Sequence, residues 1–241
     1  AMFHKEHSSV ASSKGKKGKD VPLRRTDRKH LLQVGQEVLG VTTEIENVFL
    51  KGTIFKRSLK LPSASVDLFF RSPAEEETKE EWPYTQSSQC IWMQVDENRT
   101  IYEVPGLALL SIGPTKLPTV LVPPQVSKFV CRGAHVMRAG ILRVPPASTT
   151  FVVGVCIVGN PQPFAVGILH PDLRNSNTAK FGPGTNGTGV TVLHAYGDDL
   201  WRHQLPNIKS TDGHDAGHYG NKGFVNGQYV VPTDDPPEDE A

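Results

Sequence analysis

The sequence lacks the features of a membrane-spanning or exported protein. No segment approaches the roughly 18 consecutive apolar residues that a membrane-spanning helix requires. Residues 2–20 are rich in lysine, serine and glycine, without the apolar core of a secretory signal. We therefore expect a cytoplasmic protein that has no membrane partner.

Cysteine is scarce, and its spacing does not suggest a metal site or a disulfide framework. The chain has three cysteines, which lie far apart in apolar runs and never in C-x-x-C spacing. We expect buried free thiols in a reducing compartment. They are Cys90, Cys131 and Cys156.

A histidine pair near the end of the sequence is the other feature that bears on metal binding. His214 and His218 are four residues apart, with Asp212 and Asp215 nearby. They lie in a polar, glycine-rich stretch, and no third strong ligand is expected on a stable element. We expect no metal there.

The common catalytic motifs are missing. The sequence contains no G-x-S-x-G, Walker loop, H-E-x-x-H or Rossmann fingerprint. Asp198 and Asp199 are adjacent, so in a strand they would point to opposite faces and could not form a carboxylate pair. Asp199 is expected instead to cap the last turn around Trp201. We predict a protein that is not an enzyme and needs no cofactor.

Charge is balanced overall but separated along the chain. The formal net charge is +1. Residues 5–29 hold nine Lys/Arg against three acidic residues, and residues 125–205 hold seven against three. Acidic residues gather in 72–89 and in 234–240. Such separation allows contact with a polyanion such as nucleic acid.

Residues 22–122 predict an α+β N-terminal domain, preceded by a disordered basic tail at 1–21. Alternating apolar residues predict a strand at 65–71. A Glu-rich loop is expected at 72–89, followed by a hairpin within 90–104 whose turn is polar.

Two helices are expected ahead of these strands. The apolar spacing predicts a first helix that is capped by Thr26 or Asp27, runs to about Leu39 and ends at Gly40. A second, shorter helix is expected to start at Thr43.

Pro123-Pro124 is the predicted domain boundary, because proline donates no amide hydrogen to a sheet and stiffens a linker. Apolar runs at 107–112 and 119–122 precede it. A second domain, mainly β, is expected at 125–205, followed by a flexible acidic tail or linker at 206–241.

The second domain reads as a series of short strands. Residues 151–158 form a continuous apolar run, which predicts a strand buried on both faces, and 164–169 should pair with it. A Gly/Asn/Thr-rich loop at 171–189 precedes a closing strand at 189–196. Three aromatic residues are expected in the core rather than as base-stacking platforms: Phe151, Phe164 and Trp201.

The stretch Phe129–Ile141 is the most informative one. It is expected to begin as a strand, to break at Gly133-Ala134, and to pass through a short helical turn that ends at Gly140. Cationic side chains on a glycine-shaped turn suit phosphate contact. Those in and beside the turn are Lys128, Arg132, His135, Arg138 and Arg143, and we expect Arg132 and Arg138 to be solvated. An ordinary strand–turn–strand with solvated charges explains the pattern as well.

This layout resembles the signature loop of PUA domains, small pseudo-barrels found in pseudouridine synthases, archaeosine transglycosylases and certain translation factors. Residues 189–202 look like the end of the PUA domain in ligatin, a family of eukaryotic translation initiation factors, and in the related malignant T-cell-amplified (MCT) proteins. Residues 158–167 are similar to the central PUA hairpin. The resemblance is weaker at 24–29 and 100–104.

The resemblance implies an RNA-binding protein of translation that docks on the small ribosomal subunit near the acceptor end of the initiator tRNA. It would act in unconventional initiation or in recycling. Small-subunit rRNA and initiator tRNA would be partners, as would a density-regulated-type protein or the C-terminal domains of ligatin. The predicted RNA-binding residues are Lys128, Arg132, Gly133, His135, Arg138 and Arg143, with Arg24, Arg25, Arg28 and Lys29 at the start of the first helix, where cations are unfavourable for the helix dipole.

Two questions remain open at this point, the extent of the protein and its role. The chain is either an N-terminal fragment of a ligatin-like protein, which we favour, or a free-standing MCT-like protein. The loops at 72–89 and 171–189 look like insertions, so they and the acidic tail could recruit a protein partner while the PUA domain serves as a scaffold. The targeting domain of an RNA-modifying enzyme is a third interpretation, and a catalytic domain for it is missing.

Overall fold

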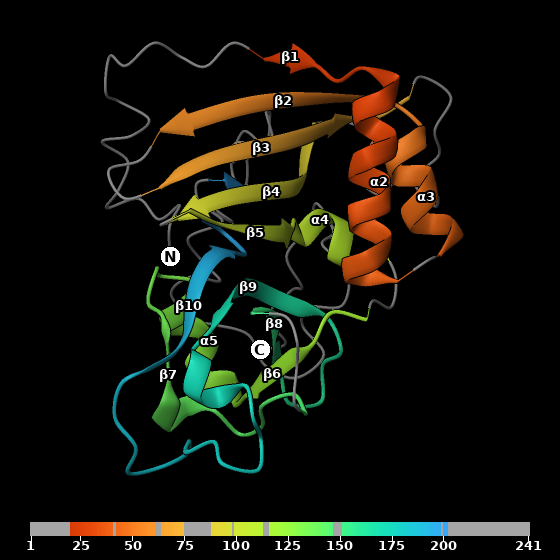
Figure 1. Cartoon of the computed structure of the whole chain (residues 1–241). Helices are drawn as coiled ribbons and strands as arrows, with labels where there is room; N and C mark the ends of the chain where they lie inside the picture. Colours follow the sequence, from red (N-terminus) through yellow and green to blue (C-terminus); the bar gives the residue numbers. More distant parts are fainter. Residues whose placement is uncertain are drawn as a thin grey trace, which may run out of the picture.

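The computed structural model shows two β-sheets, with the helices α2 and α3 beside the first (Figure 1). It describes residues 20–40, 42–60, 64–74, 88–97, 99–112, 116–146, 151–198 and 200–201. The predicted tails, most of the Glu-rich loop and the His214/His218 pair therefore lie outside the described residues. None of the described helices is long and apolar enough to span a membrane.

The first sheet is antiparallel, with its strands in the order β1-β2-β3-β4-β5. Its strands are β1 (Val21–Pro22), β2 (Thr53–Lys60), β3 (Ser65–Ser72), β4 (Gln89–Glu97) and β5 (Thr100–Pro105). The predicted strand at 65–71 and the predicted hairpin are both present. The strands β1 and β2 were not predicted from the sequence.

Both predicted helices form, with small differences at their starts. The first, α2 (Arg25–Leu39), has Arg24 rather than Thr26 or Asp27 at its N-cap, and Gly40 ends it with a φ of 88°. The second, α3 (Thr43–Leu50), is capped by Thr42, whose hydroxyl accepts a hydrogen bond from the amide of Ile45. These helices pack on the sheet through buried apolar side chains, and the ring of Phe49 lies edge-on to Trp92 with centroids 6.2 Å apart.

The second sheet has the order β6-β8-β9-β10-β7, in which β6 and β8 are parallel and the other pairs are antiparallel. Its strands are β6 (Thr119–Val122), β7 (Val136–Met137), β8 (Val152–Ile157), β9 (Pro163–Leu169) and β10 (Thr188–Ala195). Every residue of β8 is buried, as the uninterrupted apolar run predicted. The predicted pairing with β9 and the closing strand β10 are also present.

Short helical segments occur where the apolar pattern alone was ambiguous. The sequence assigned no secondary structure to the apolar run at 107–112. This run contains the helix α4 (Leu107–Leu110), which packs on β4 and β9. The predicted loop at 171–189 begins with the 3-10 turn η3 (Pro171–Leu173).

The expected boundary at Pro123-Pro124 lies inside the second sheet region. Strand β6, which the sequence placed in the first domain, pairs with β8 through Val120 and Val155. The two prolines come directly after β6, and Pro124 is the first residue of helix α5 (Pro124–Val130) rather than part of a linker. A division of the chain into two domains remains a proposal, and we place the change near Leu117.

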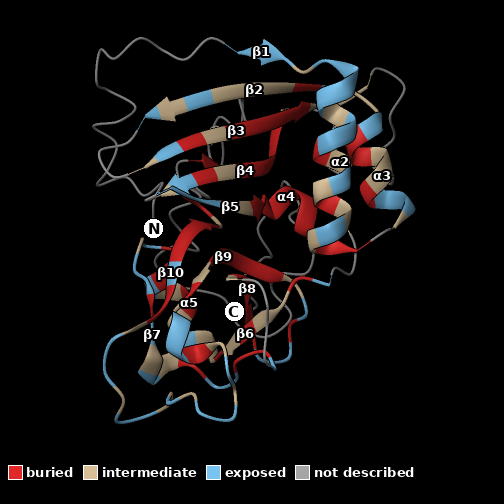
Figure 2. Ribbon diagram, in the orientation of Figure 1, coloured by how far each residue is buried: buried red, intermediate tan, exposed pale blue. Residues whose placement is uncertain are grey.

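Buried side chains form two cores, one of which spans both sheets (Figure 2). The first core includes residues of both sheets, such as Trp92 from β4 and Leu193 from β10. Strand β5 contacts β8 and β9, and Tyr102 meets the ring of Phe151 at 6.3 Å between centroids. The two sheets are therefore packed on each other by apolar contacts.

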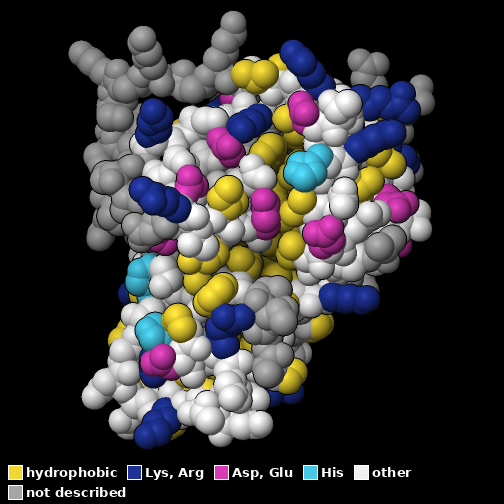
Figure 3. All heavy atoms as spheres, in the orientation of Figure 1, with side chains coloured by type: hydrophobic (Ala, Val, Ile, Leu, Met, Phe, Trp, Pro, Cys, Tyr) yellow, Lys and Arg dark blue, Asp and Glu magenta, His cyan; other side chains and the backbone are white. Residues whose placement is uncertain are grey.

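The face seen in Figure 3 shows a strip of hydrophobic side chains beside α2, with Asp/Glu and Lys/Arg side chains around it. On this part of the molecule charges of both signs are interspersed. Two ion pairs involve strand β2: Lys56 lies 2.7 Å from Asp67, and Arg57 pairs with Asp20 at 2.7 Å.

Candidate nucleic-acid interface

The stretch Phe129–Ile141, which was expected to begin as a strand, begins with the last residues of helix α5 (Pro124–Val130). Pro124 stands at the first helical position of α5, where its missing amide hydrogen costs no bond. The Ser127 side chain is buried, and its hydroxyl donates a hydrogen bond to the Pro124 carbonyl at 2.6 Å. The prediction of a strand that begins at Phe129 and breaks at Gly133-Ala134 was wrong, because this N-terminal proline signal outweighs the β-propensity of the Phe-Val-Cys run.

The turn after α5 depends on Gly133, as predicted. Its φ is 101°, a conformation that side chains rarely adopt, and its amide donates to the Val130 carbonyl at 2.9 Å. The amide of Ala134 donates to the Phe129 carbonyl at 3.0 Å. The chain therefore reverses within a few residues and brings the segments on either side of the turn close together.

A short helical turn follows, also as predicted. It is the 3-10 turn η2 (Arg138–Gly140), which comes directly after β7. A Cβ atom on Gly140 would lie 2.9 Å from a methyl group of Val126. The missing side chain thus lets η2 pack directly against α5. The apolar run after Gly140 forms only an isolated bridge between Arg143 and Leu121 instead of a strand.

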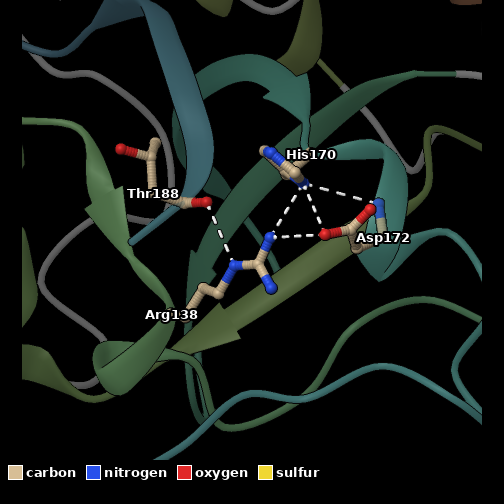
Figure 4. A network of polar contacts seen from close by, with 4 residues as sticks. All are labelled: Arg138, His170, Asp172 and Thr188. Atoms are coloured by element: carbon tan, nitrogen blue, oxygen red, sulfur yellow. Dashed lines mark hydrogen bonds and ion pairs between the residues drawn. The ribbon is translucent and has the colours of Figure 1, made fainter. Parts of the chain in front are cut away.

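Arg138 is held inside this surface, contrary to the expectation that it is solvated. Its side chain is 16% exposed. The guanidinium donates to the carbonyl of Thr188 at 3.4 Å, to Nδ1 of His170 at 2.9 Å and to Oδ2 of Asp172 at 3.1 Å (Figure 4). Because an arginine can only donate, His170 accepts through Nδ1. Arg138 therefore ties η2 to the segment after β9 and to β10.

The backbone of Arg138 is held by the glycine-rich loop. Its amide donates to the carbonyl of Gly187 at 2.9 Å, and its carbonyl accepts from the amide of Gly182 at 2.9 Å. The φ angles of these two glycines are 94° and 93°. The loop, which the sequence treated as an insertion of unknown role, thus lies beside the predicted interface.

His135 also has a structural contact. Its Nδ1 accepts a hydrogen bond from the amide of Val192 at 3.1 Å. Burial lowers the pKa of His135 from its ordinary value of 6.5. The neutral imidazole therefore joins the turn to β10, and protonation at Nδ1 would remove that hydrogen bond.

Three predicted cations remain near the surface. Arg132 and Arg143 are exposed, and Lys128 lies half-buried with its ammonium 5.0 Å from the centroid of the Phe129 ring. From residue 124 to 146 the chain has four Lys/Arg and no acidic residue. This segment therefore carries only positive charge, although the exposed Asp172 of another segment pairs with Arg138.

The second predicted cluster, at the start of α2, has a different arrangement. Arg24, Arg25 and Lys29 are exposed. Arg28 instead donates to the carbonyls of Phe49 at 2.8 Å and of Leu50 at 2.6 Å, and also to that of Lys51. It therefore satisfies the last carbonyls of α3, which have no partner within the helix. Burial lowers the pKa of Arg28, and Arg71 nearby acts in the same direction.

Sequence reasoning missed exposed apolar side chains in the turn region. Phe129, Met137 and Leu142 are each 51% exposed. It also missed Arg174, whose guanidinium lies 3.9 Å from the centroid of the Phe151 ring. Each of the three apolar residues stands next to a buried neighbour in the sequence, so only the structure shows which of them are exposed.

Asp198 fixes the end of the fold, and Asp199, which the sequence predicted as a cap, lies outside the described residues. The buried carboxylate of Asp198 accepts from the amide of Trp201 at 2.8 Å and from that of Ala195 at 2.9 Å, and it contacts Nδ1 of His194 at 2.9 Å. Asp198 therefore caps the final turn. Trp201 and Phe164 are buried as predicted, while Phe151 is half-buried.

The thiols are unsuited to reaction. Cys90, Cys131 and Cys156 are free and buried, as predicted. Burial raises the pKa of Cys90 and of Cys156 to about 12 and raises that of Cys131 as well. Among the described residues no three His, Cys, Asp or Glu side chains form a group that could hold a metal ion.

Comparison with known proteins agrees with this geometry. Residues 117–199 match the family model described as "elF2D, PUA domain". These residues are a PUA domain of that family. The match begins ahead of β6, in agreement with the pairing of that strand in the second sheet. The predicted fold, an α+β region followed by a PUA pseudo-barrel, is confirmed.

Curated relatives are similar over about half of this chain. Eukaryotic translation initiation factor 2D of mouse is 32% identical over 124 residues, and that of cattle is 37% identical over the same length. In each case the alignment covers 49% of this chain and 20% of the relative, so the chain spans about a fifth of the proteins it matches. A solved structure, a conserved PUA domain protein from Thermoplasma acidophilum, is 12% identical with a TM-score of 0.48, and the alignment covers 77% of this chain and 99% of that one.

Proposed function

We propose that this chain is an RNA-binding part of a translation initiation factor similar to factor 2D. It docks on the small ribosomal subunit near the acceptor end of the initiator tRNA and acts in unconventional initiation or in recycling, in the cytoplasm. The observation that carries the proposal is the turn of the PUA domain. There Arg132 and Arg143 are exposed, and no acidic residue occurs from 124 to 146.

The mechanism is recognition. Exposed guanidinium and ammonium groups replace the counterions of phosphates, and the release of those ions makes affinity depend on salt. Hydrogen bonds to phosphates fix the position of the protein on its RNA without reading a sequence. Arg138 acts differently, since its donors are directed to Thr188, His170 and Asp172. It is a positioning residue that holds the turn in place.

Cosedimentation with purified small ribosomal subunits tests the proposal. Reversing two exposed charges together, Arg132→Glu with Arg143→Glu, should reduce binding at least about tenfold, because two charge-assisted contacts turn into repulsions. The control is Lys60→Glu with Arg99→Glu, which makes the same charge change on two exposed residues, one at the end of β2 and one in the turn between β4 and β5. If both double variants bind alike, the turn does not make the contact.

Chemical footprinting of initiator tRNA on the small subunit separates the finer parts of the proposal. Protection of the acceptor end by the chain, lost in Arg132→Glu with Arg143→Glu, is the expected result. Binding to the subunit without that protection would retain the ribosomal role and refute the position near the tRNA.

Recognition without catalysis is open to a direct check. RNA incubated with the chain should keep its nucleoside masses, because the proposal involves no covalent step. A mass change that depends on the chain would instead favour an RNA-modifying role.

A further inference from the structure

Arg138, His170 and Asp172 form a polar cluster that joins η2 to η3 (Figure 4). The Arg138 guanidinium donates to Nδ1 of His170 at 2.9 Å and to Oδ2 of Asp172 at 3.1 Å. Its contact with the Thr188 carbonyl is longer, at 3.4 Å. The two shorter contacts that hold this guanidinium therefore both come from the start of η3.

The contact between Arg138 and His170 requires a neutral imidazole. Two groups reach Nδ1, and both are N–H donors: the Arg138 guanidinium and, at 3.4 Å, the amide of Asp172. Nδ1 must therefore keep a free lone pair. The His170 side chain is 43% exposed, so a proton from solvent can reach it. Histidine is the side chain that ordinarily changes its charge between about pH 8 and 5.

Protonation of Nδ1 would exchange the partners within the cluster. A protonated Nδ1 donates and no longer accepts from Arg138, and the two positive groups, whose nitrogens lie 2.9 Å apart, repel each other. An acceptor for the new proton is already close, because Oδ2 of Asp172 lies 3.6 Å from Nδ1. Asp172 would then pair with His170, and the guanidinium would keep only the long contact with Thr188.

The other elements around His170 leave this exchange to the three side chains. Within the described part of the chain, its charged partners are Arg138 of η2 and Asp172 of η3. Strand β10 provides a backbone carbonyl, that of Gly189, which accepts from the His170 amide at 2.9 Å. The glycine-rich loop at 182–187 has no charged side chain. Two more cations follow on the same segment, the first packed on an aromatic ring and the second exposed: Arg174 and Lys180.

We propose that Arg138, His170 and Asp172 form a pH-sensitive switch in the PUA domain. With neutral His170 the Arg138 guanidinium is held. With charged His170, Asp172 pairs with the imidazolium, and the guanidinium turns to solvent, where it is available to an anion such as phosphate. The switch itself depends on these three side chains. Its effect on RNA rests on the proposed function and adds a form of regulation to it.

Nuclear magnetic resonance of the full chain tests the switch without RNA. The order parameter of the Arg138 Nε–H bond and the ring signals of His170 are followed from about pH 7.5 to 5. The order parameter should fall from about 0.85, the value of a rigid bond, to below about 0.6, with the same midpoint as the His170 signals. In His170→Gln, whose side-chain oxygen accepts without titrating, it should stay high. A rigid Arg138 beside a fully protonated His170 would overturn the proposal.

Two further variants separate the members of the cluster from their surroundings. His135→Gln removes another titrating ring near the turn, and the change in Arg138 should persist; if it disappears, His135 and not His170 controls the guanidinium. Asp172→Asn removes a negative charge beside the ring, so His170 should take up its proton at a lower pH. An unchanged His170 midpoint in this variant would refute the exchange of partners.

Fluorescence anisotropy with labelled initiator tRNA measures the consequence for binding. Between about pH 7.5 and 6 the unchanged chain should gain about 2- to 10-fold more affinity than His170→Gln, the range of one additional hydrogen bond. In Arg138→Ala this additional gain should vanish. If it persists there, the charge of His170 acts alone, and the proposed effect on RNA is wrong. If the tRNA binds at neither pH, the proposed function fails, whereas the order parameter of Arg138 still decides the switch.

Discussion

The two clusters of cations that the sequence placed at an RNA interface differ in their surroundings. At the start of the chain, residues 24–46 hold four Lys/Arg and four acidic residues, whereas residues 124–146 hold four Lys/Arg and no acidic ones. In each cluster one arginine is tied to backbone carbonyls. Arg28 holds the end of α3, and Arg138 holds Thr188 of β10. The comparison teaches that a run of basic residues does not define a phosphate site until the directions of its donors are known.

The largest effect is expected where the turn of the second cluster depends on a glycine. Gly133→Val places a β-branched residue at a φ of 101° and should lower the free energy of unfolding by about 2–3 kcal/mol. Asparagine tolerates positive φ better, so Gly133→Asn should cost clearly less. Urea unfolding measures both values. Equal small losses in the two variants would show that this conformation is not required.

The first cluster is tested by comparing two of its arginines. Arg28→Ala removes a charged donor from three carbonyls and should lower the free energy of unfolding by about 2 kcal/mol. Arg25→Ala, on the exposed side of the same helix, should stay within about 0.5 kcal/mol of the unchanged protein. Chemical denaturation of both variants decides between a structural and a solvated role. The account of Arg28 fails if its removal costs no more than that of Arg25.

The same contrast is expected inside the second cluster. Arg138→Ala should cost about 1–2 kcal/mol of unfolding free energy, because its contacts with Thr188, His170 and Asp172 are lost. Arg143→Ala, at an exposed position, should cost about 0.5 kcal/mol or less. Thermal unfolding ranks the two variants. A reversed order would mean that the Arg138 contacts do not hold the turn.

A small dependence on pH is expected from His135. Burial lowers its pKa in the folded state, so the unfolded state binds more protons as the pH falls below about 6.5. The stability that neutral His135 provides is therefore complete above that pH and is lost as the pH falls through the lowered pKa. The unfolding free energy of His135→Gln, which does not titrate, should depend less on pH between about 7.5 and 5. Urea unfolding at several pH values checks this, and an identical pH dependence in both proteins would contradict it.

Patterns that are local in the sequence predicted much of the fold. The apolar run of β8, the hairpin β4–β5 and the helices α2 and α3 follow from periodicity, caps and turn residues, and all are present. Strand β2 was missed because charged residues interrupt its alternation at Lys56-Arg57. The end of helix α5, from Phe129, was read as a strand although Pro124 supplied a signal for a helix start.

The candidate site was less predictable, because its contacts join distant residues. The positions of Gly133 and Gly140 could be read from the sequence. The hydrogen bond of Arg138 to the Thr188 carbonyl could not be predicted, because the two residues are fifty positions apart in the sequence. The same holds for Arg28, whose carbonyl acceptors lie on another helix.

The salt dependence of RNA affinity tests the central claim most directly, namely that the turn of the PUA domain contacts phosphates. For Arg132→Ala with Arg143→Ala, the slope of log affinity against log salt should become shallower by about 1.4–1.8, the value for two lost phosphate contacts. Arg24→Ala with Arg25→Ala, from the charge-balanced cluster, should change it less. An unchanged slope in the first variant, or a larger change in the second, would contradict the account.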